Sequence, residues 1–243
     1  MQNESFEVRR SHDALYLEEN RYTEPKEMFK FIVNHAFDKN ERTSDLSICD
    51  FGCAAGEFLY YLNRIHPTAN FEGIDVMASL IEKAEKFVPS AKYTEGSVLD
   101  SLVKAENSFD KSFLIGVHSI FDEFETCFNN LIKFTKPGGG VYIVGMFNPF
   151  PVDVLIKYKE SSNYASNIYE SGWNIFSQKS VSEFIDKNPK VKSYSFKKFD
   201  ITIDLPRQKD PIRSWTLRDY KDSRWIINGL CILQPHYLLE IRL

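Results

Sequence analysis

The chain has few cysteines, and none of them form the pairs that bind zinc. Four cysteines occur in 243 residues, with no C-x-x-C pair. Cys49 and Cys53 are four positions apart, in a segment where small residues favour close packing. The five histidines are scattered, with no two at the spacing of a metal-ligand motif. The sequence therefore predicts neither a metal site nor a disulfide framework.

Long apolar segments are also missing. No uninterrupted apolar run approaches the roughly 18 residues that a membrane span needs. The first seven residues carry two acids and no apolar stretch like that of a signal peptide. We therefore expect no membrane partner and a cytoplasmic location. The length of 243 residues, with 43% hydrophobic and 26% charged residues, fits one globular α/β domain.

The chain lacks the excess of positive charge that a nucleic-acid partner requires. Its formal net charge is −4, whereas phosphate backbones are bound by basic surfaces. A run of lysines lies between residues 187 and 198, but Asp186 and Asp200 bracket it and no arginine joins it. Such a run is typical of a solvated face. We therefore expect no nucleic-acid partner.

What the chain does contain is a strand followed by a glycine turn and a helix. The apolar run that starts at Leu46 ends at Asp50 and Phe51, and Gly52 and Gly56 interrupt the pattern. Residues 57–62 then have the pattern that is typical of the start of a helix. This geometry places a small ligand against backbone at a helix N-terminus.

The glycine spacing excludes two common ligands of such a turn. In the dinucleotide fingerprint G-x-G-x-x-G, counted from Gly52, the second and third glycines would stand at Ala54 and Glu57. No Gly-Lys-Ser/Thr follows, so the turn is not a P-loop. Asp50 at the end of the strand would repel a pyrophosphate but suits a cation. An ordinary turn without a ligand is the alternative.

A second acid follows at the spacing of a ribose ligand. Residues 71–76 form an apolar strand pattern that contains Asp75, which follows Gly56 by 19 positions, 75 − 56. A ribose-binding carboxylate is expected about 20 residues after the turn, and a carboxylate accepts from both ribose hydroxyls. The alternative is that Asp75 caps the helix predicted for residues 78–85.

Three more strand patterns follow, in residues 91–98, 109–118 and 141–144. A Pro-Gly-Gly-Gly turn, residues 137–140, stands between a helix pattern at 125–134 and the last of these strands. Five strand patterns that alternate with helices over residues 46–146 predict a parallel sheet covered by helices.

The chain resembles the class I S-adenosylmethionine (SAM) methyltransferases of the small-molecule type. The resemblance lies in the order of three features: the motif D-x-G-x-x-x-G from Asp50, the acid at Asp75 and the Pro-Gly turn. The resemblance covers about half of the chain. It implies SAM as the cofactor and S-adenosylhomocysteine (SAH) as the product. It also implies an α/β, Rossmann-like fold: a seven-stranded, mostly parallel sheet with helices on both faces and an antiparallel last strand. A further hairpin that contains Trp215 and Trp225 departs from the minimal pattern.

The resemblance also implies which residues bind the cofactor. Ser97 stands where the family often has an acid for the adenine amine, so adenine recognition by Ser97 and the Val98 backbone is open. The implied cofactor residues are Asp50, Gly52, Cys53, Ala54, Gly56, Asp75, Val76, Ser97, Val98 and Gly116.

We expect a single methyltransferase domain, residues 1–243, with four parts. Residues 1–45 form an N-terminal helical flap and residues 46–146 the SAM-binding core. Residues 147–190 form an insert over the acceptor, and residues 191–243 supply the last strands and the hairpin. Packing or a dimer surface is the alternative for the aromatic segment of this insert, residues 147–176, and the chain is expected to be a monomer or homodimer.

The acceptor site is predicted from position along the chain. His118 follows the fourth strand and is the candidate general base, with Asp122 and Glu123 near enough in sequence to orient it; helix capping or packing beside adenosine is the alternative. Tyr22 is a candidate lid aromatic or a core residue. The further acceptor candidates are Asn148, Arg213 and His236.

The predicted activity is methyl transfer from SAM to a small polar metabolite. The resemblance suggests an oxygen acceptor on a sugar or related precursor, in a bacterial surface-polysaccharide or natural-product pathway. Two alternatives stay open: an RNA or protein methyltransferase, and a non-catalytic SAM-binding partner subunit.

Overall fold

A computed structural model describes most of the chain. The predicted N-terminal flap and the predicted insert lie partly outside the described residues. The described residues are 15–18, 20–38, 41, 43–159, 161, 165, 167 and 169–243.

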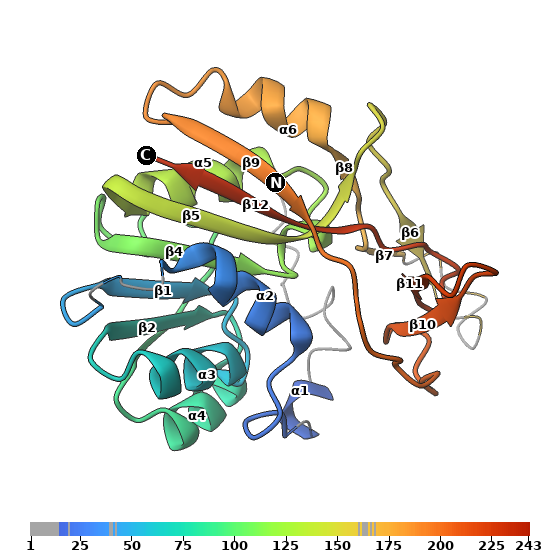
Figure 1. Ribbon diagram of the computed structural model, residues 1–243, viewed down its shortest axis with the longest axis horizontal. Helices are drawn as coiled ribbons and strands as arrows, with labels where there is room; N and C mark the ends of the chain where they lie inside the picture. The colour runs from blue at the N-terminus through green and yellow to red at the C-terminus, as the bar shows by residue number, and fades with distance from the viewer. Residues whose placement is uncertain are drawn as a thin grey trace.

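One mixed sheet forms the centre of the molecule (Figure 1). Its strands are β1 (Ser47–Phe51), β2 (Asn70–Asp75), β3 (Lys92–Glu95), β4 (Phe109–Ile115), β5 (Thr135–Asn148), β8 (Phe176–Ser177), β9 (Ser193–Lys198) and β12 (His236–Arg242). Seven of them follow the order β3-β2-β1-β4-β5-β12-β9, and β8 pairs with β5 off this path. Strands β1 to β5 run parallel, while β12 is antiparallel to both β5 and β9. The predicted seven-stranded sheet with an antiparallel last strand is confirmed.

Helices cover both faces of this sheet, as predicted. Helices α2 and α3 pack with one core cluster, which contains Phe29, Leu62 and Phe113. Helices α5 and α6 pack with the other, which contains Phe51 and Leu131. Burial on both faces explains the long apolar run of β5, residues 141–147, all of which are buried. The helices are α1 (Leu15–Glu18), α2 (Glu27–Ala36), α3 (Glu57–Ile65), α4 (Ala78–Phe87), α5 (Glu125–Phe134) and α6 (Gln178–Ile185), with a short 3-10 turn η2 (His118–Ile120).

One boundary differs from the sequence prediction. The Pro-Gly-Gly-Gly segment was expected to be a turn before a strand, but β5 already begins at Thr135, which pairs with Phe109. The next paired residues are Lys111 and Gly140, so the segment forms an irregularity within the strand. Pro25 lies just before the helix cap, Lys26, and α2 begins two residues after it.

The last part of the predicted insert belongs to the body of the fold. Val181 and Ile185 of α6 are fully buried in the core cluster of α5. Ser177 caps α6, since its side chain accepts from the Ser180 backbone N–H. Within the predicted insert, the residues before β8 are therefore the part that can cover the end of the sheet.

Two small hairpins lie beyond the carboxyl ends of the parallel strands (Figure 1). One pairs β6 (Lys157–Tyr158) with β7 (Glu170–Ser171), and the other pairs β10 (Trp215–Arg218) with β11 (Arg224–Ile227). The second is the predicted Trp215/Trp225 hairpin.

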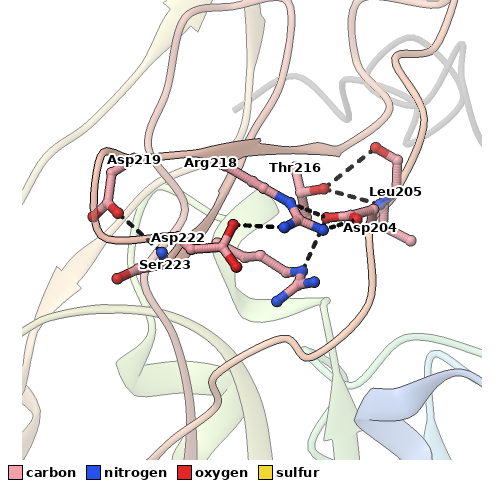
Figure 2. A network of polar contacts seen from close by, with 8 residues as sticks. Asp204, Leu205, Thr216, Arg218, Asp219, Asp222 and Ser223 are labelled. Carbon is pink, nitrogen blue, oxygen red and sulfur yellow. Dashed lines mark hydrogen bonds and ion pairs between the residues drawn. The ribbon is translucent and has the colours of Figure 1, made fainter.

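A charged network holds the β10–β11 hairpin to the chain that precedes it (Figure 2). Asp204 accepts from Arg218 Nε at 3.1 Å and from Arg224 Nε at 2.9 Å. These two guanidinium groups lower the pKa of Asp204 to about 2. The Leu205 backbone N–H donates to Thr216 Oγ1 at 2.9 Å. The hairpin is therefore tied to residues 204 and 205 by polar contacts, while its own Trp215 and Ile226 side chains are buried.

Candidate functional site

A cavity lies at the carboxyl ends of β1, β2 and β4, where ligands bind in open α/β sheets. Its lining includes six of the residues predicted from the sequence to bind a cofactor: Asp50, Gly52, Cys53, Ala54, Asp75 and Gly116. The strands bring these residues together although they are spread over more than sixty positions. The sequence prediction of a ligand site at this edge therefore coincides with a cavity.

The glycine turn between β1 and α3 is fastened to β2. The backbone N–H groups of Gly52 and Cys53 both donate to the Ile74 carbonyl, at 2.7 and 3.0 Å. The Ala54 N–H donates to Asp75 Oδ2 at 2.9 Å. Gly52 and Ala54 both have positive φ values, 77° and 46°, which turn the backbone sharply beneath the cavity. The turn is thus held rigidly in front of any ligand.

Asp75 fixes the local chain as well as lining the cavity. Its second oxygen, Oδ1, accepts from the Met77 N–H at 3.0 Å, and Met77 is the residue that precedes α4. This resembles the alternative role that the sequence allowed, a cap near the start of that helix. Because each carboxylate oxygen has two lone pairs, Asp75 keeps the capacity to accept from a ligand.

Asp50 is a buried carboxylate with an unused oxygen. It is only 3% exposed, and its Oδ1 has no hydrogen-bond partner among the described residues. Burial raises the pKa of Asp50 well above its ordinary value; Asp75 adds to this effect and Lys26 opposes it. Buried polar atoms normally have a hydrogen-bond partner. The unpartnered Oδ1 of Asp50 therefore suits a ligand that carries a cation or an N–H donor.

Three glycines of the prediction serve different purposes. A Cβ at Gly116, where φ is 72°, would meet no atom within 4 Å, so the backbone there borders open space. A Cβ at Gly52 would come within 2.4 Å of Val117 Cγ2. At Gly56 it would approach Ala84 Cβ to 2.9 Å, on α4. Gly56 does not line the cavity and permits close packing of the turn against α4.

Val76, Ser97 and Val98 do not line the cavity among the described residues. Ser97 Oγ accepts from the Leu99 N–H at 3.1 Å, which closes a local turn. The Val98 carbonyl accepts from Asn130 Nδ2 at 2.8 Å. Adenine recognition by Ser97 or Val98 stays a prediction, to which these contacts add no support.

His118 lies in the core rather than in the cavity. Its ring is fully buried and stacks on Phe147 with centroids 4.6 Å apart, while Phe128 meets it edge-on. Nε2 is 3.4 Å from the Met146 carbonyl oxygen, and Nδ1 has no partner among the described residues. Burial lowers the pKa of His118 to about 4. This placement favours packing over the predicted role of a general base, because the ring reaches no ligand space.

The acids expected to orient His118 have other partners. Asp122 accepts from the Ser171 hydroxyl. Glu123 accepts from the Thr126 N–H at 2.9 Å, at the start of α5. Neither carboxylate contacts the imidazole, so the predicted His118 relay is not assembled.

Three of the four predicted acceptor residues lie outside the lining of the cavity. Tyr22 is 3% exposed and stacks on Phe87, which is the core-packing alternative. Asn148 binds within its own loop, since its Nδ2 donates to the Val152 carbonyl at 2.8 Å. Burial lowers the pKa of His236 to about 4.

Arg213 is the predicted acceptor residue that approaches the cavity. Its guanidinium lies 5.1 Å from the ring centroid of Tyr16, and Tyr16 lines the cavity. The loop before the β10–β11 hairpin therefore meets the N-terminal segment at the cavity wall. Arg213 stays a predicted acceptor residue on this evidence.

The prediction missed the cavity residues that the N-terminal segment supplies. Tyr16, Lys26 and Phe29 line the cavity together with Glu57 and Ile120. Glu57 follows the glycine turn directly, so its position could have been inferred from the motif. Lys26 and Phe29 are separated by three positions, which puts them on one side of α2. Nothing in the local sequence of α2 indicates that this side meets the glycine turn.

His118 makes the folded state sensitive to acid. Its folded pKa lies below the ordinary value of 6.5, so the unfolded chain binds a proton more readily and stability falls as the pH is lowered from 6.5 towards 4. Between pH 7 and pH 5 this amounts to about 2 kcal/mol. We expect His118→Phe to reduce the dependence of the unfolding free energy on pH in that range by about this amount, while His236, whose pKa is also lowered to about 4 by burial, keeps its own contribution. Denaturant titrations at several pH values measure it, and an unchanged slope would contradict the buried placement.

The described residues contain neither a cluster of metal ligands nor a membrane-spanning helix. No group of three or more His, Cys, Asp or Glu side chains is arranged to hold a metal ion in that part of the chain. No helix among the same residues has the length and apolar character to cross a membrane.

Known proteins share the fold of this chain and part of its sequence pattern. A family model described as a methyltransferase domain matches residues 42–188. A search of curated protein sequences found no match. Similar solved structures include the YcgJ protein of Bacillus subtilis, at 15% identity and TM-score 0.58, over 88% of this chain and 97% of that one. The geranyl diphosphate C-methyltransferase of Streptomyces coelicolor A3(2) has 14% identity and TM-score 0.55, over 88% and 76%. TehB of Haemophilus influenzae has 11% identity and TM-score 0.54, over 95% and 66%.

Proposed function

The chain belongs to the methyltransferase-domain family, and on that premise we propose that it binds SAM and methylates a small-molecule acceptor. The observation that carries the proposal is the buried, unpartnered Oδ1 of Asp50 in a cavity at the carboxyl end of the sheet. A neutral or anionic ligand would leave this carboxylate without a counter-charge. A ligand with an ammonium group supplies one.

The cavity residues fit SAM in charge and in shape. Asp50 would hold the ammonium group and Asp75 the ribose hydroxyls, since both are carboxylates on the cavity wall. Gly116 offers backbone without a side chain next to open space. Among the described lining residues, three carboxylates face one ammonium group: Asp50, Glu57 and Asp75 against Lys26. This excess of negative charge favours a cationic ligand.

When bound, SAM supplies a methyl group on a positively charged sulfonium. The chain's part is to orient the acceptor and exclude water, because positioning alone can lower the barrier of such a transfer substantially. The lining offers no histidine among the described residues. We therefore propose a transfer that depends on proximity and does not use His118 as a base.

We propose that the acceptor is a small polar metabolite, an oxygen acceptor on a sugar or related precursor. Tyr16 and Phe29 of the N-terminal segment line the same cavity as Asp50, which leaves a partly enclosed space that suits a small molecule. The net charge of −4 weighs against RNA. One structural neighbour is titled a C-methyltransferase, so the fold by itself does not set the acceptor atom.

Titration calorimetry with SAM, SAH and NADH tests the cofactor. We expect SAM and SAH to bind at micromolar concentration and NADH to give no heat, because Asp50 would repel its pyrophosphate. Tight NADH binding without any response to SAM would overturn the proposal. Release of SAH from SAM in the presence of a panel of sugar nucleotides then separates an enzyme from a non-catalytic SAM-binding subunit.

A further inference from the structure

Glu57 is an acid at the cavity wall whose two oxygens are held by one neighbouring segment. It is the first residue of α3 and its side chain is 7% exposed. Oε1 accepts from the Arg21 backbone N–H at 3.3 Å. Oε2 lies 3.3 Å from Lys26 Nζ. Both partners belong to residues 21–26, the segment that leads into α2.

Lys26 carries its charge into the cavity wall. Its side chain is 31% exposed, against 7% for Glu57. Its Nζ lies 5.6 Å from the ring centroid of Tyr16 and 5.4 Å from that of Phe29, and all four residues line the cavity. A largely buried carboxylate is stable only with a partner, so Lys26 cannot leave Glu57 without a cost.

The same segment is also attached to the glycine turn. The Tyr22 hydroxyl donates to the Ala55 carbonyl at 2.7 Å. The Tyr22 ring stacks on Phe87 of α4, with centroids 3.8 Å apart and planes at 11°. Residues 21–26 therefore contact the turn at Ala55 and the helix start at Glu57, on either side of Gly56. A ligand that contacts the glycine turn therefore contacts residues that are themselves bonded to this segment.

We propose that the Lys26–Glu57 ion pair is a latch that keeps residues 21–26 closed against the cavity and so retains the cofactor. The inference rests on the proposed function, since the retained ligand is SAM or SAH. Glu57 and Lys26 are positioning residues in this scheme. They act by holding the segment whose other contact, Tyr22, fixes the glycine turn.

Two single variants and their double variant test the latch in the full chain. Glu57→Gln keeps an oxygen for the Arg21 N–H but removes the charge that holds Lys26. Lys26→Met removes the ammonium and keeps the length of the side chain. Each is expected to speed SAH dissociation roughly tenfold, within the range of a partly buried ion pair. The double variant should be no worse than the worse single one, because both remove the same interaction.

Lys30→Met is the matched control. Lys30 lies on α2 and pairs with Glu27 at 2.6 Å, but the two side chains are 48% and 30% exposed and neither lines the cavity. Its SAH dissociation rate should equal that of the unaltered protein. Stopped-flow displacement of SAH gives the rates, and thermal unfolding checks that all variants fold.

Hydrogen exchange of the ligand-free protein gives an independent readout. The amides of residues 21–24 and 26 should exchange faster in Glu57→Gln and Lys26→Met than in Lys30→Met. If they exchange as in the unaltered protein, the latch is overturned whether or not the protein binds SAH. Tighter SAH binding by Lys26→Met would also overturn it, because Lys26 would then compete with the ligand. Absence of SAH binding by the unaltered protein, with faster exchange in both variants, would reject the proposed function and keep the closed segment.

Discussion

Asp50→Asn is expected to weaken SAM binding by about 3 kcal/mol or more, roughly a hundredfold, the scale for removing one partner of a buried ion pair. The substitution keeps the shape of a side chain that is 3% exposed, but it replaces one oxygen with an NH2 group and removes the negative charge that would pair with an ammonium group. Calorimetry of the folded variant measures the change. An affinity within threefold of the unaltered protein would remove Asp50 from the ligand site.

The matched control is Asp110→Asn. Asp110 lies in β4 at the other end of the sheet, where it accepts from the Ser47 N–H at 2.8 Å and from Lys136 Nζ at 2.8 Å. It does not line the cavity. This variant should lose some stability and bind SAM normally, which separates loss of a carboxylate from loss of the ligand's counter-charge.

The pH dependence of binding follows from the same residue. Because burial raises the pKa of Asp50 in the free protein and a cationic ligand favours the ionised carboxylate, binding SAM must release a proton below that raised pKa. The affinity is then expected to fall as the pH is lowered through that region, approaching tenfold per unit. Asp50→Asn should show a flat profile, and calorimetry in buffers of different ionisation enthalpy should detect the released proton only with Asp50 present.

Gly116→Val is expected to lower SAM affinity by about two orders of magnitude. This corresponds to ~3 kcal/mol, the upper end of the cost of forcing extra carbon atoms into a site that is already filled. A Cβ at this position enters open space next to the cavity. The folded protein tolerates it better than the complex does. Equilibrium binding and thermal unfolding together separate the two effects.

Gly138→Val controls for backbone strain. Gly138 has φ of 84°, close to the 72° of Gly116, and a Cβ there would also meet nothing within 4 Å. Its N–H donates to the Leu243 carbonyl at 2.7 Å, away from the cavity. Both variants bear the cost of a side chain in left-handed backbone, about 1–2 kcal/mol. Equal loss of SAM affinity in the two would mean that strain, not the filled cavity, caused the effect.

The sequence predicted the cavity residues that depend on local motif order. Asp50, Gly52 and Asp75 stand at strand ends, and parallel strands bring their carboxyl ends to one edge whatever the rest of the chain does. Gly56 shows the limit of such reasoning. A positive φ at this position, 78° in the structure, could be expected from the glycine. The atom that leaves no room for a side chain there, Ala84 Cβ, comes from a helix nearly thirty residues away.

His118 and Lys26 show what the sequence could not predict. His118 does follow β4 as expected, but whether its ring faces a ligand or the core depends on one turn of η2 and on Phe147 and Phe128 around it. Lys26 lines the cavity in a segment whose Tyr22 packs on Tyr60 of α3 and Phe87 of α4. Neither packing arrangement leaves a periodic signal in the chain.

The place of β12 in the sheet has a consequence for how the molecule assembles. This strand lies between β5 and β9, yet both precede it along the chain. Until residues 236–242 insert, β5 presents an open edge with the buried residues Val144 and Met146, and β9 has no neighbour at all. Open apolar edges invite pairing with other chains, and pairings between distant segments form slowly. Refolding is therefore expected to pass through a concentration-sensitive interval that ends when β12 closes the gap. The cavity strands depend on it less, because β1 pairs with β2 and with β4 over shorter sequence separations than β12 pairs with β5.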